Sequence, residues 1–353
     1  MGQAGKMSGK KHALSLAFLL LLIVFTFTVL LKDIGIKGLC LAIGHAQPGY
    51  LVLGLSLMLV FFFCEGEAIR MIVKSLGHPV KHWQGFVYAC VDFYFSAITP
   101  SSSGGQPVCL YYMSKDHVPV AASGLAMLLQ TVVYKLVLIG LGIWVLIMES
   151  EWFKNGNWGV QLLFWGGFVI NLIVIATCLL AMFSKRVIQK LALWVIRIGA
   201  KIRLVKDPEG TTEKLFHSLE EYAQGAVYIR THYLMVLRVF AVTVVQRLAM
   251  FSIAYWVYLA MGLGEYGLFD MIALQTLIAM SIDSLPLPGG MGASEGVFSM
   301  LYYNVYGPAL LVPGLVVTRG INYYLGLIIS SIVVIANQSR IVRGEKNRAS
   351  KPE

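Results

Sequence analysis

The sequence predicts an all-α polytopic membrane protein built from two inverted repeats, with about six full transmembrane helices and two re-entrant broken-helix hairpins. Three observations predict this class. Hydrophobic residues make up 58% of the 353 positions and charged residues only 13%, a balance that soluble chains do not have. Runs of about 20 apolar residues recur, each long enough to cross a hydrocarbon layer. Two further apolar stretches are interrupted near their middle by proline and glycine.

The first repeat, residues 13–148, follows a basic N-terminus at 1–12. Its first apolar run is long and no small-residue cleavage site follows it, so we interpret the run as an uncleaved anchor and not as a signal peptide. The repeat contains three expected crossings and one expected re-entrant hairpin, in the order 13–31, 48–64, hairpin 85–112 and 120–148.

The second repeat, residues 149–338, has the same order of elements. It includes the only sizeable soluble segment, an expected cytoplasmic loop at 184–231, and a basic tail follows at 339–353. Its membrane segments are expected at 160–183, 233–263, hairpin 269–304 and 309–337.

The distribution of basic residues predicts the orientation. If the two interrupted stretches enter and leave on one side and the other six cross, 21 of the 28 Lys and Arg residues fall on the side of the termini and three on the other. Basic residues accumulate in cytoplasmic loops, so both termini are expected in the cytoplasm. The net charge of +10 therefore reports orientation, and we expect no nucleic-acid partner.

Two pairs of short motifs indicate the internal repeat. The stretch "ITPSSSGGQP" (98–107) is similar to "SLPLPGGMG" (284–292). Pro100 and Pro286 are separated by 186 positions, and Gly104 and Gly289 by 185. Downstream, "VVYK" and "VVTR" follow at an offset of 184. Since each half has three full crossings, the second half begins on the opposite face and is expected to be inverted, as in many secondary transporters.

The proline and glycine breaks predict a polar site at membrane depth. They leave backbone N–H and C=O groups that hydrocarbon cannot satisfy, so the breaks are expected to lie within protein or beside a wet cavity. Helix N-termini at such breaks offer N–H donors and a partial positive charge that suit a phosphate. The candidate substrate-binding residues at the breaks are Ser101, Ser102, Ser103, Gly104, Gly105, Gln106, Gly289 and Gly290.

Charged residues inside the apolar segments add to this site. Lys135, Arg247 and Arg319 are expected to hold an anionic headgroup, or to pair with carboxylates as structural ion pairs, and the two roles can coexist. The carboxylates on the interrupted stretches are expected to balance these charges, to act in gating, or to take up and release a proton: Asp92, Asp283 and Glu295. At the inner end of the second crossing, Glu65, Glu67 and Arg70 favour an interfacial salt bridge.

The sequence motifs that could indicate an enzyme are not supported by their surroundings. "GASEG" (292–296) matches the nucleophile elbow, but that motif requires a preceding strand, and none of the seven histidines falls deep in an expected span. The five cysteines show no paired spacing. We therefore expect no catalytic residue, no metal and no cofactor, and a transporter is favoured over an enzyme.

The motifs also resemble a family. "DFYFSAITPSSSGGQPVCLYYM", "VVYKL", "PLPGGMGASEG" and "VVTRGINYYLG" are similar to the flippase-type membrane domain of the lysylphosphatidylglycerol synthase family, over about residues 15–339. The resemblance implies a multi-pass protein of the bacterial cytoplasmic (inner) membrane that moves an anionic or aminoacylated phospholipid between leaflets. Full-length members add a soluble aminoacyltransferase domain. This chain ends at Glu353 and is not expected to synthesise lysyl-lipid.

Three functions stay open at this point. The first is a flippase or transporter for a phospholipid or a lipid-linked phosphate, with membrane phospholipid as its partner. The second is an integral-membrane transferase acting on a phospholipid or a polyprenyl-phosphate carrier. The third is a non-catalytic partner of an envelope enzyme. Glycine-rich runs are compatible with a homo-oligomer and equally with packing within one chain.

Overall fold

The computed structural model describes residues 44, 46–99, 104–154, 158–184, 220, 222–283, 285, 287 and 290–349, with side chains described as far as Ile341. The described residues form helices and connecting turns, without strands. The first expected crossing, most of the expected cytoplasmic loop and the two ends of the chain lie outside the described residues. The helices in chain order are α3 (Pro48–Ser75), α4 (His82–Ile98), α5 (Gly105–Lys115), α6 (Val120–Met148), α7 (Ser150–Lys154), α8 (Trp158–Phe183), α11 (Tyr233–Ala260), α12 (Leu268–Ile282), α13 (Ala293–Arg319), the π-helix η3 (Gly320–Leu325) and α14 (Gly326–Ala349).

Five helical segments are long and apolar enough to cross a membrane. They are α3, α6, α8, α11 and the segment 293–341, which includes α13, η3 and the described part of α14. Large apolar side chains of α8 such as Leu162, Ile173 and Leu180 point outward and are exposed, which suits lipid contact and not water. The predicted class, an all-helical polytopic membrane protein, is confirmed.

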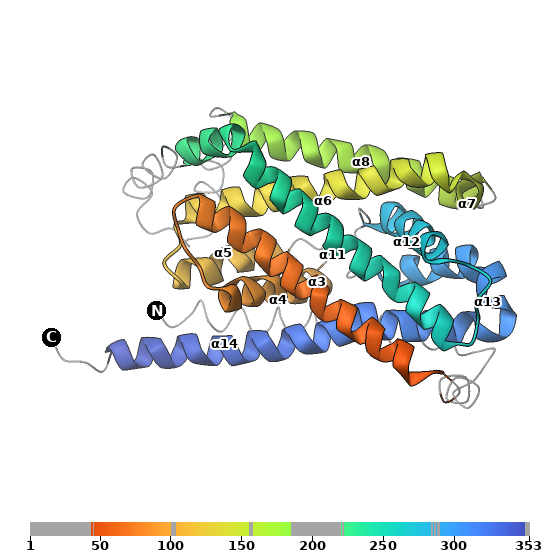
Figure 1. Cartoon of the computed structure of the whole chain (residues 1–353). Coiled ribbons are helices and arrows are strands. Elements are labelled where there is room, and N and C mark those ends of the chain that lie inside the picture. The colour runs from red at the N-terminus through yellow and green to blue at the C-terminus, as the bar shows by residue number, and fades with distance from the viewer. Residues whose placement is uncertain are drawn as a thin grey trace.

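Helices α3 and α11 form a long antiparallel pair that crosses the molecule (Figure 1). The backbone N–H of Gln47, before α3, donates to the carbonyl of Ala260, the last residue of α11, at 2.9 Å. Both helices have 28 residues and begin 185 positions apart. Helices α4 and α12 begin 186 positions apart. These spacings support the predicted repeat, while the inversion of one half relative to the other stays a prediction.

Two pairs of helices are each separated by a break. The first is α4 and α5, with the break after Ile98, and the second is α12 and the first part of α13, with the break after Ile282. Helix α4 starts at the end of the molecule where α3 ends, whereas α12 starts where α11 ends (Figure 1). Because α3 and α11 are antiparallel, the two pairs start from opposite ends. Their entry into a bilayer from opposite faces stays a prediction.

Helix α13 contains a sharp turn at Gly307, which ends the first part of the helix. Gly307 has φ 66° and non-helical geometry, which a residue with a side chain rarely adopts. Beyond this turn the Tyr306 ring lies against Gly314, where a Cβ would come within 2.5 Å of the ring. The chain therefore reverses between the first part of α13 and the segment that continues through η3 into α14. This turn separates the predicted hairpin 269–304 from the predicted crossing 309–337.

The two breaks meet in one buried apolar cluster. Ala97 and Ile98 at the end of α4 pack with Met291, just before α13, and with Tyr323 of η3. The Tyr323 hydroxyl donates to the carbonyl of Ala97 at 3.1 Å. Residues flanking breaks almost 190 positions apart in the sequence are thus neighbours, and they position the charged side chains described next.

Candidate functional site

The described residues of the first break are held by local hydrogen bonds. The Gly104 N–H donates to the Thr99 hydroxyl at 2.9 Å, so this donor is occupied. Gly105 is the first residue of α5 and packs against Asp92, leaving no space for a Cβ. The Gln106 amide donates to the Thr131 hydroxyl of α6 at 2.5 Å. The predicted residues Ser101, Ser102 and Ser103 lie outside the described residues.

At the second break, Glu295 caps the start of α13. Its Oε2 accepts the Gly292 N–H at 2.6 Å, as a capping-box glutamate does. Gly290 has φ 66°, a left-handed conformation that favours glycine. Gly289 is outside the described residues. Because Gly104 and Gly292 already donate to side chains, a phosphate at these helix starts would have to replace an internal partner.

Lys135 of α6 is paired with Asp283, which follows α12. The Lys135 Nζ contacts Asp283 Oδ2 directly, and the Tyr134 hydroxyl donates to Asp283 Oδ1 at 2.6 Å. Both charged side chains are largely buried. The ion pair joins the two halves of the chain next to the second break.

Arg319, the residue that the repeat relates to Lys135, is paired with Glu295. Its Nε donates to Glu295 Oε1 at 2.8 Å, and its guanidinium lies over the Tyr323 ring at 4.7 Å. Tyr323 also belongs to the apolar cluster where the breaks meet. Glu295 thus connects the capping of α13 with the charge of Arg319.

Arg247 of α11 lies between Glu65 of α3 and the Tyr134 ring. Its Nη2 is 3.8 Å from Glu65 Oε2, and its guanidinium is 4.1 Å from the centre of the Tyr134 ring. The Gln130 amide donates to Glu65 Oε1 at 3.0 Å, and the Gln246 amide donates to Oε2. Tyr134 therefore contacts both the Arg247 pair and the Asp283 pair.

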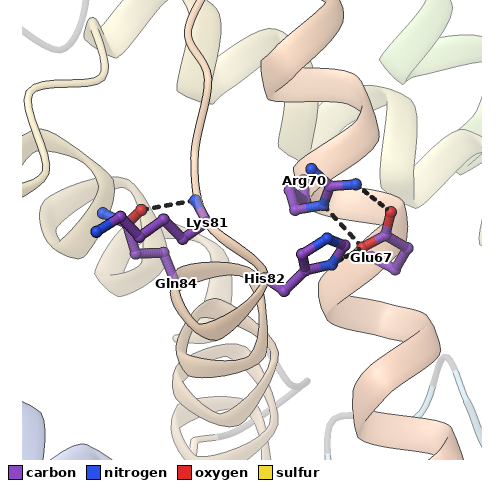
Figure 2. Close-up of polar contacts among 5 residues, drawn as sticks. All are labelled: Glu67, Arg70, Lys81, His82 and Gln84. Carbon is purple, nitrogen blue, oxygen red and sulfur yellow. Dashed lines mark hydrogen bonds and ion pairs between the residues drawn. The ribbon is translucent and has the colours of Figure 1, made fainter.

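Sequence reasoning did not place Glu65, Tyr134, Gln130 or Gln246 in this site. The sequence favours an interfacial salt bridge among Glu65, Glu67 and Arg70. The structure contains the ion pair of Glu67 with Arg70, and its position at the membrane interface stays a prediction. The Arg70 Nη2 is 2.6 Å from Glu67 Oε1, and His82 also contacts Glu67 at 2.9 Å (Figure 2). Glu65, two residues earlier, is turned into the interior. Gln246 was a sequence signal for this site, because it is a polar residue directly before Arg247 in an apolar segment.

All three predicted intramembrane cations thus have a carboxylate partner in this arrangement. An unpaired charge at the centre of a membrane costs about 3 kcal/mol or more, and pairing reduces this cost. Of the two roles predicted for Lys135, Arg247 and Arg319, the structure shows the ion pair with a carboxylate. A headgroup would have to exchange with these carboxylates.

Asp92 differs from the other carboxyls. It lies in α4 beneath Gly105, its Oδ1 is buried, and this oxygen has no hydrogen-bond partner in the described part of the chain. Glu65 and Arg247 are charged groups that act on it electrostatically. The predicted balancing of a basic residue by a direct ion pair is therefore seen for Asp283 and Glu295, whereas no such pair is found for Asp92 among the described residues.

The site offers no metal-binding group within the residues described. No three His, Cys, Asp or Glu side chains there come together in a way that could hold an ion. Ser294 of the elbow-like motif is buried in the first turn of α13, and a turn precedes it. The strand that the nucleophile elbow requires is not present before it.

The fold and these paired charges define an all-helical, multi-pass membrane protein with a polar interior. Residues 12–330 match the family described as the lysylphosphatidylglycerol synthase TM region, and the chain belongs to this family. A UPF0104 membrane protein of Archaeoglobus fulgidus is 21% identical over 286 residues, covering 80% of this chain and 85% of that protein. The resemblance inferred from the break motifs is thereby confirmed.

Proposed function

We propose that the protein is a lipid flippase, which moves an anionic or aminoacylated phospholipid, or a lipid-linked phosphate, between the leaflets of the bacterial cytoplasmic membrane. The distribution of basic residues supports cytoplasmic termini. The lipid tails stay in the bilayer while the headgroup passes through the polar interior. The family match supports a lipid-related membrane function, and the choice of a flippase is our own proposal.

One observation carries the proposal: paired charges from five elements gather where the two helix breaks converge. Lys135, Arg247 and Arg319 come from α6, α11 and α13, and their carboxylate partners from α3, from the residue after α12 and from α13. A rigid structural core could use apolar side chains at lower desolvation cost. Ionisable side chains inside membrane segments instead mark substrate pathways, and binding sites of many transporters lie at helix breaks.

The ion pairs provide a means of exchange. A phosphate has the charge and the acceptor oxygens of a carboxylate, so it can replace Asp283 at Lys135 or Glu295 at Arg319. The net worth of a buried ion pair is small because desolvation offsets the attraction. Replacing one anion by another therefore changes the free energy little, and when the headgroup leaves, the carboxylate returns to the cation.

The proposal predicts that removing both members of one ion pair strongly slows lipid exchange without unfolding the protein. In the double variant Lys135→Met/Asp283→Asn, both charges are absent, so no unpaired charge is buried, but the phosphate loses its cation. Wild type and variant are purified, reconstituted into vesicles with a labelled anionic phospholipid, and followed for leaflet exchange. We expect the protein-dependent rate to fall at least about tenfold, because a lost charge-assisted contact is worth roughly 1.5 kcal/mol or more.

The matched control is the ion pair of Glu67 with Arg70, which lies beside His82 at the start of α4 and not at a break. Glu67→Gln/Arg70→Gln also removes one carboxylate and one cation, but from the hydrogen-bonded group at the end of α3 (Figure 2). We expect wild-type exchange. Exchange by Lys135→Met/Asp283→Asn at the wild-type rate would remove this pair from the mechanism. No exchange of any anionic lipid by the wild type would refute the flippase and favour a transferase or a partner role.

A further inference from the structure

Among the four carboxyls Glu65, Asp92, Asp283 and Glu295, Asp92 is the one without an ion pair in the described residues. Glu65, Asp283 and Glu295 each face one of the three buried cations. For Asp92 no ion pair is found in the described residues, and its buried Oδ1 accepts no hydrogen bond there. This oxygen lies close against α5, because a Cβ on Gly105 would collide with it.

Titratable groups on three other helices are electrostatically coupled to Asp92. Two of them are the Glu65 carboxyl of α3 and the Arg247 guanidinium of α11. Helix α5 contributes the Cys109 thiol. Helix α14 also packs against α4, where Gly326 lies against Phe93 and Leu327 packs with the end of α4. Arg247 is thus the cation that acts on Asp92, and it is already paired with Glu65.

Counted over the described residues, the charges at this centre balance only if Asp92 is neutral. Three carboxylates cancel three cations, so an ionised Asp92 would add one unmatched negative charge beside Glu65. A carboxyl with a buried oxygen that has no partner in the described residues avoids this by keeping a proton. We propose that Asp92 is a proton-binding site, and that its proton binds cooperatively with the anionic headgroup, so that protons and lipid are coupled. The coupling rests on the proposed function, whereas the proton site itself does not.

The sign of the coupling follows from the same charges. A headgroup phosphate brings a further negative charge, which the centre accommodates best when Asp92 is neutral. As the pH rises and Asp92 loses its proton, its carboxylate repels the phosphate and competes with it for Arg247. Binding of the lipid is therefore strongest at low pH and weakens as the pH rises. For one proton per headgroup, affinity falls by at most about tenfold per pH unit.

The test combines two readouts on wild type, Asp92→Asn and a control. Asparagine has nearly the same shape and stays neutral, so it imitates protonated Asp92. The control, Glu151→Gln, removes an exposed carboxyl of α7. The first readout is the binding of a labelled anionic phospholipid as a function of pH. The second is the infrared absorption of protonated carboxyl groups during a pH titration, which requires no lipid transport.

We expect the wild type and Glu151→Gln to bind lipid less tightly as the pH rises, and Asp92→Asn to keep the low-pH affinity throughout. The infrared band of a protonated buried carboxyl should be present in the wild type and missing in Asp92→Asn. An unchanged band in Asp92→Asn would overturn the proton site. A missing band with identical pH dependence of binding in both proteins would overturn the coupling. If the wild type binds no anionic lipid at any pH, the flippase proposal fails and the infrared band alone decides the proton site.

Discussion

Replacing Lys135 by methionine is expected to destabilise the protein by about 3 kcal/mol or more, because the buried Asp283 carboxylate loses its only charged partner among the described residues. The Tyr134 hydroxyl continues to donate to Asp283, but one neutral donor does not balance a charge. The measurement is thermal unfolding of the purified protein in detergent. We expect a clearly lower unfolding temperature than that of the wild type.

The double variant Lys135→Met/Asp283→Asn is the matched control for this prediction. It removes both charges, so it should recover most of the stability lost in either single variant. The recovery measures the coupling between the two side chains. If the single variant were as stable as the wild type, Lys135 and Asp283 would not form the buried pair described here.

Replacing Gly167 of α8 by alanine is expected to have the second largest effect. The added Cβ would collide with the backbone carbonyl of Met280 in α12, and backbone cannot move aside as a flexible side chain can. Overpacking of this kind costs about 1–3 kcal/mol, and we expect the upper end of this range. Asp283 lies three residues after Met280, so a displaced α12 should also weaken the Lys135–Asp283 pair and slow lipid exchange.

The neighbouring glycine supplies the control. A Cβ on Gly166 would meet nothing within 4 Å, so Gly166→Ala should be neutral, or stabilise the helix by roughly 0.5–1 kcal/mol. Both variants are compared by thermal unfolding and by lipid exchange in vesicles. Equal stability of Gly166→Ala and Gly167→Ala would show that α8 and α12 do not pack as closely as described.

Much of the fold could be predicted because a helix that crosses the hydrocarbon layer needs about 20 predominantly apolar residues. The apolar runs at 120–148 and 160–183 become α6 and α8 with nearly the same bounds. The expected crossing at 48–64 lies within α3, which continues to Ser75. Glu65 lies in this continuation and is buried.

The candidate site was predictable only in part. Periodicity and charge indicated that Lys135, Arg247 and Arg319 need partners, but they did not decide which carboxylate belongs to which cation, because this depends on how distant helices pack. Asp283 was named as a candidate partner, whereas Glu65 was not. Likewise Gly166 and Gly167 are equivalent in the sequence, and only the approach of α12 distinguishes them.

The central claim is that each broken helix pair enters and leaves on its own side of the membrane, so that the breaks meet within it. Four exposed positions flank the two pairs: Lys81 and Ser114 around α4 and α5, and Glu265 and Asn304 around α12 and the first part of α13. Single cysteines at these positions, with the five native cysteines replaced, are treated in sealed vesicles with a thiol reagent that cannot cross the membrane.

We expect Lys81→Cys and Ser114→Cys to react only from the cytoplasmic side, and Glu265→Cys and Asn304→Cys only from the opposite side. Reaction of the two members of either pair from different sides would mean that the broken segment crosses the membrane. Reaction of all four from one side would place both breaks on the same face. Either result would contradict the account.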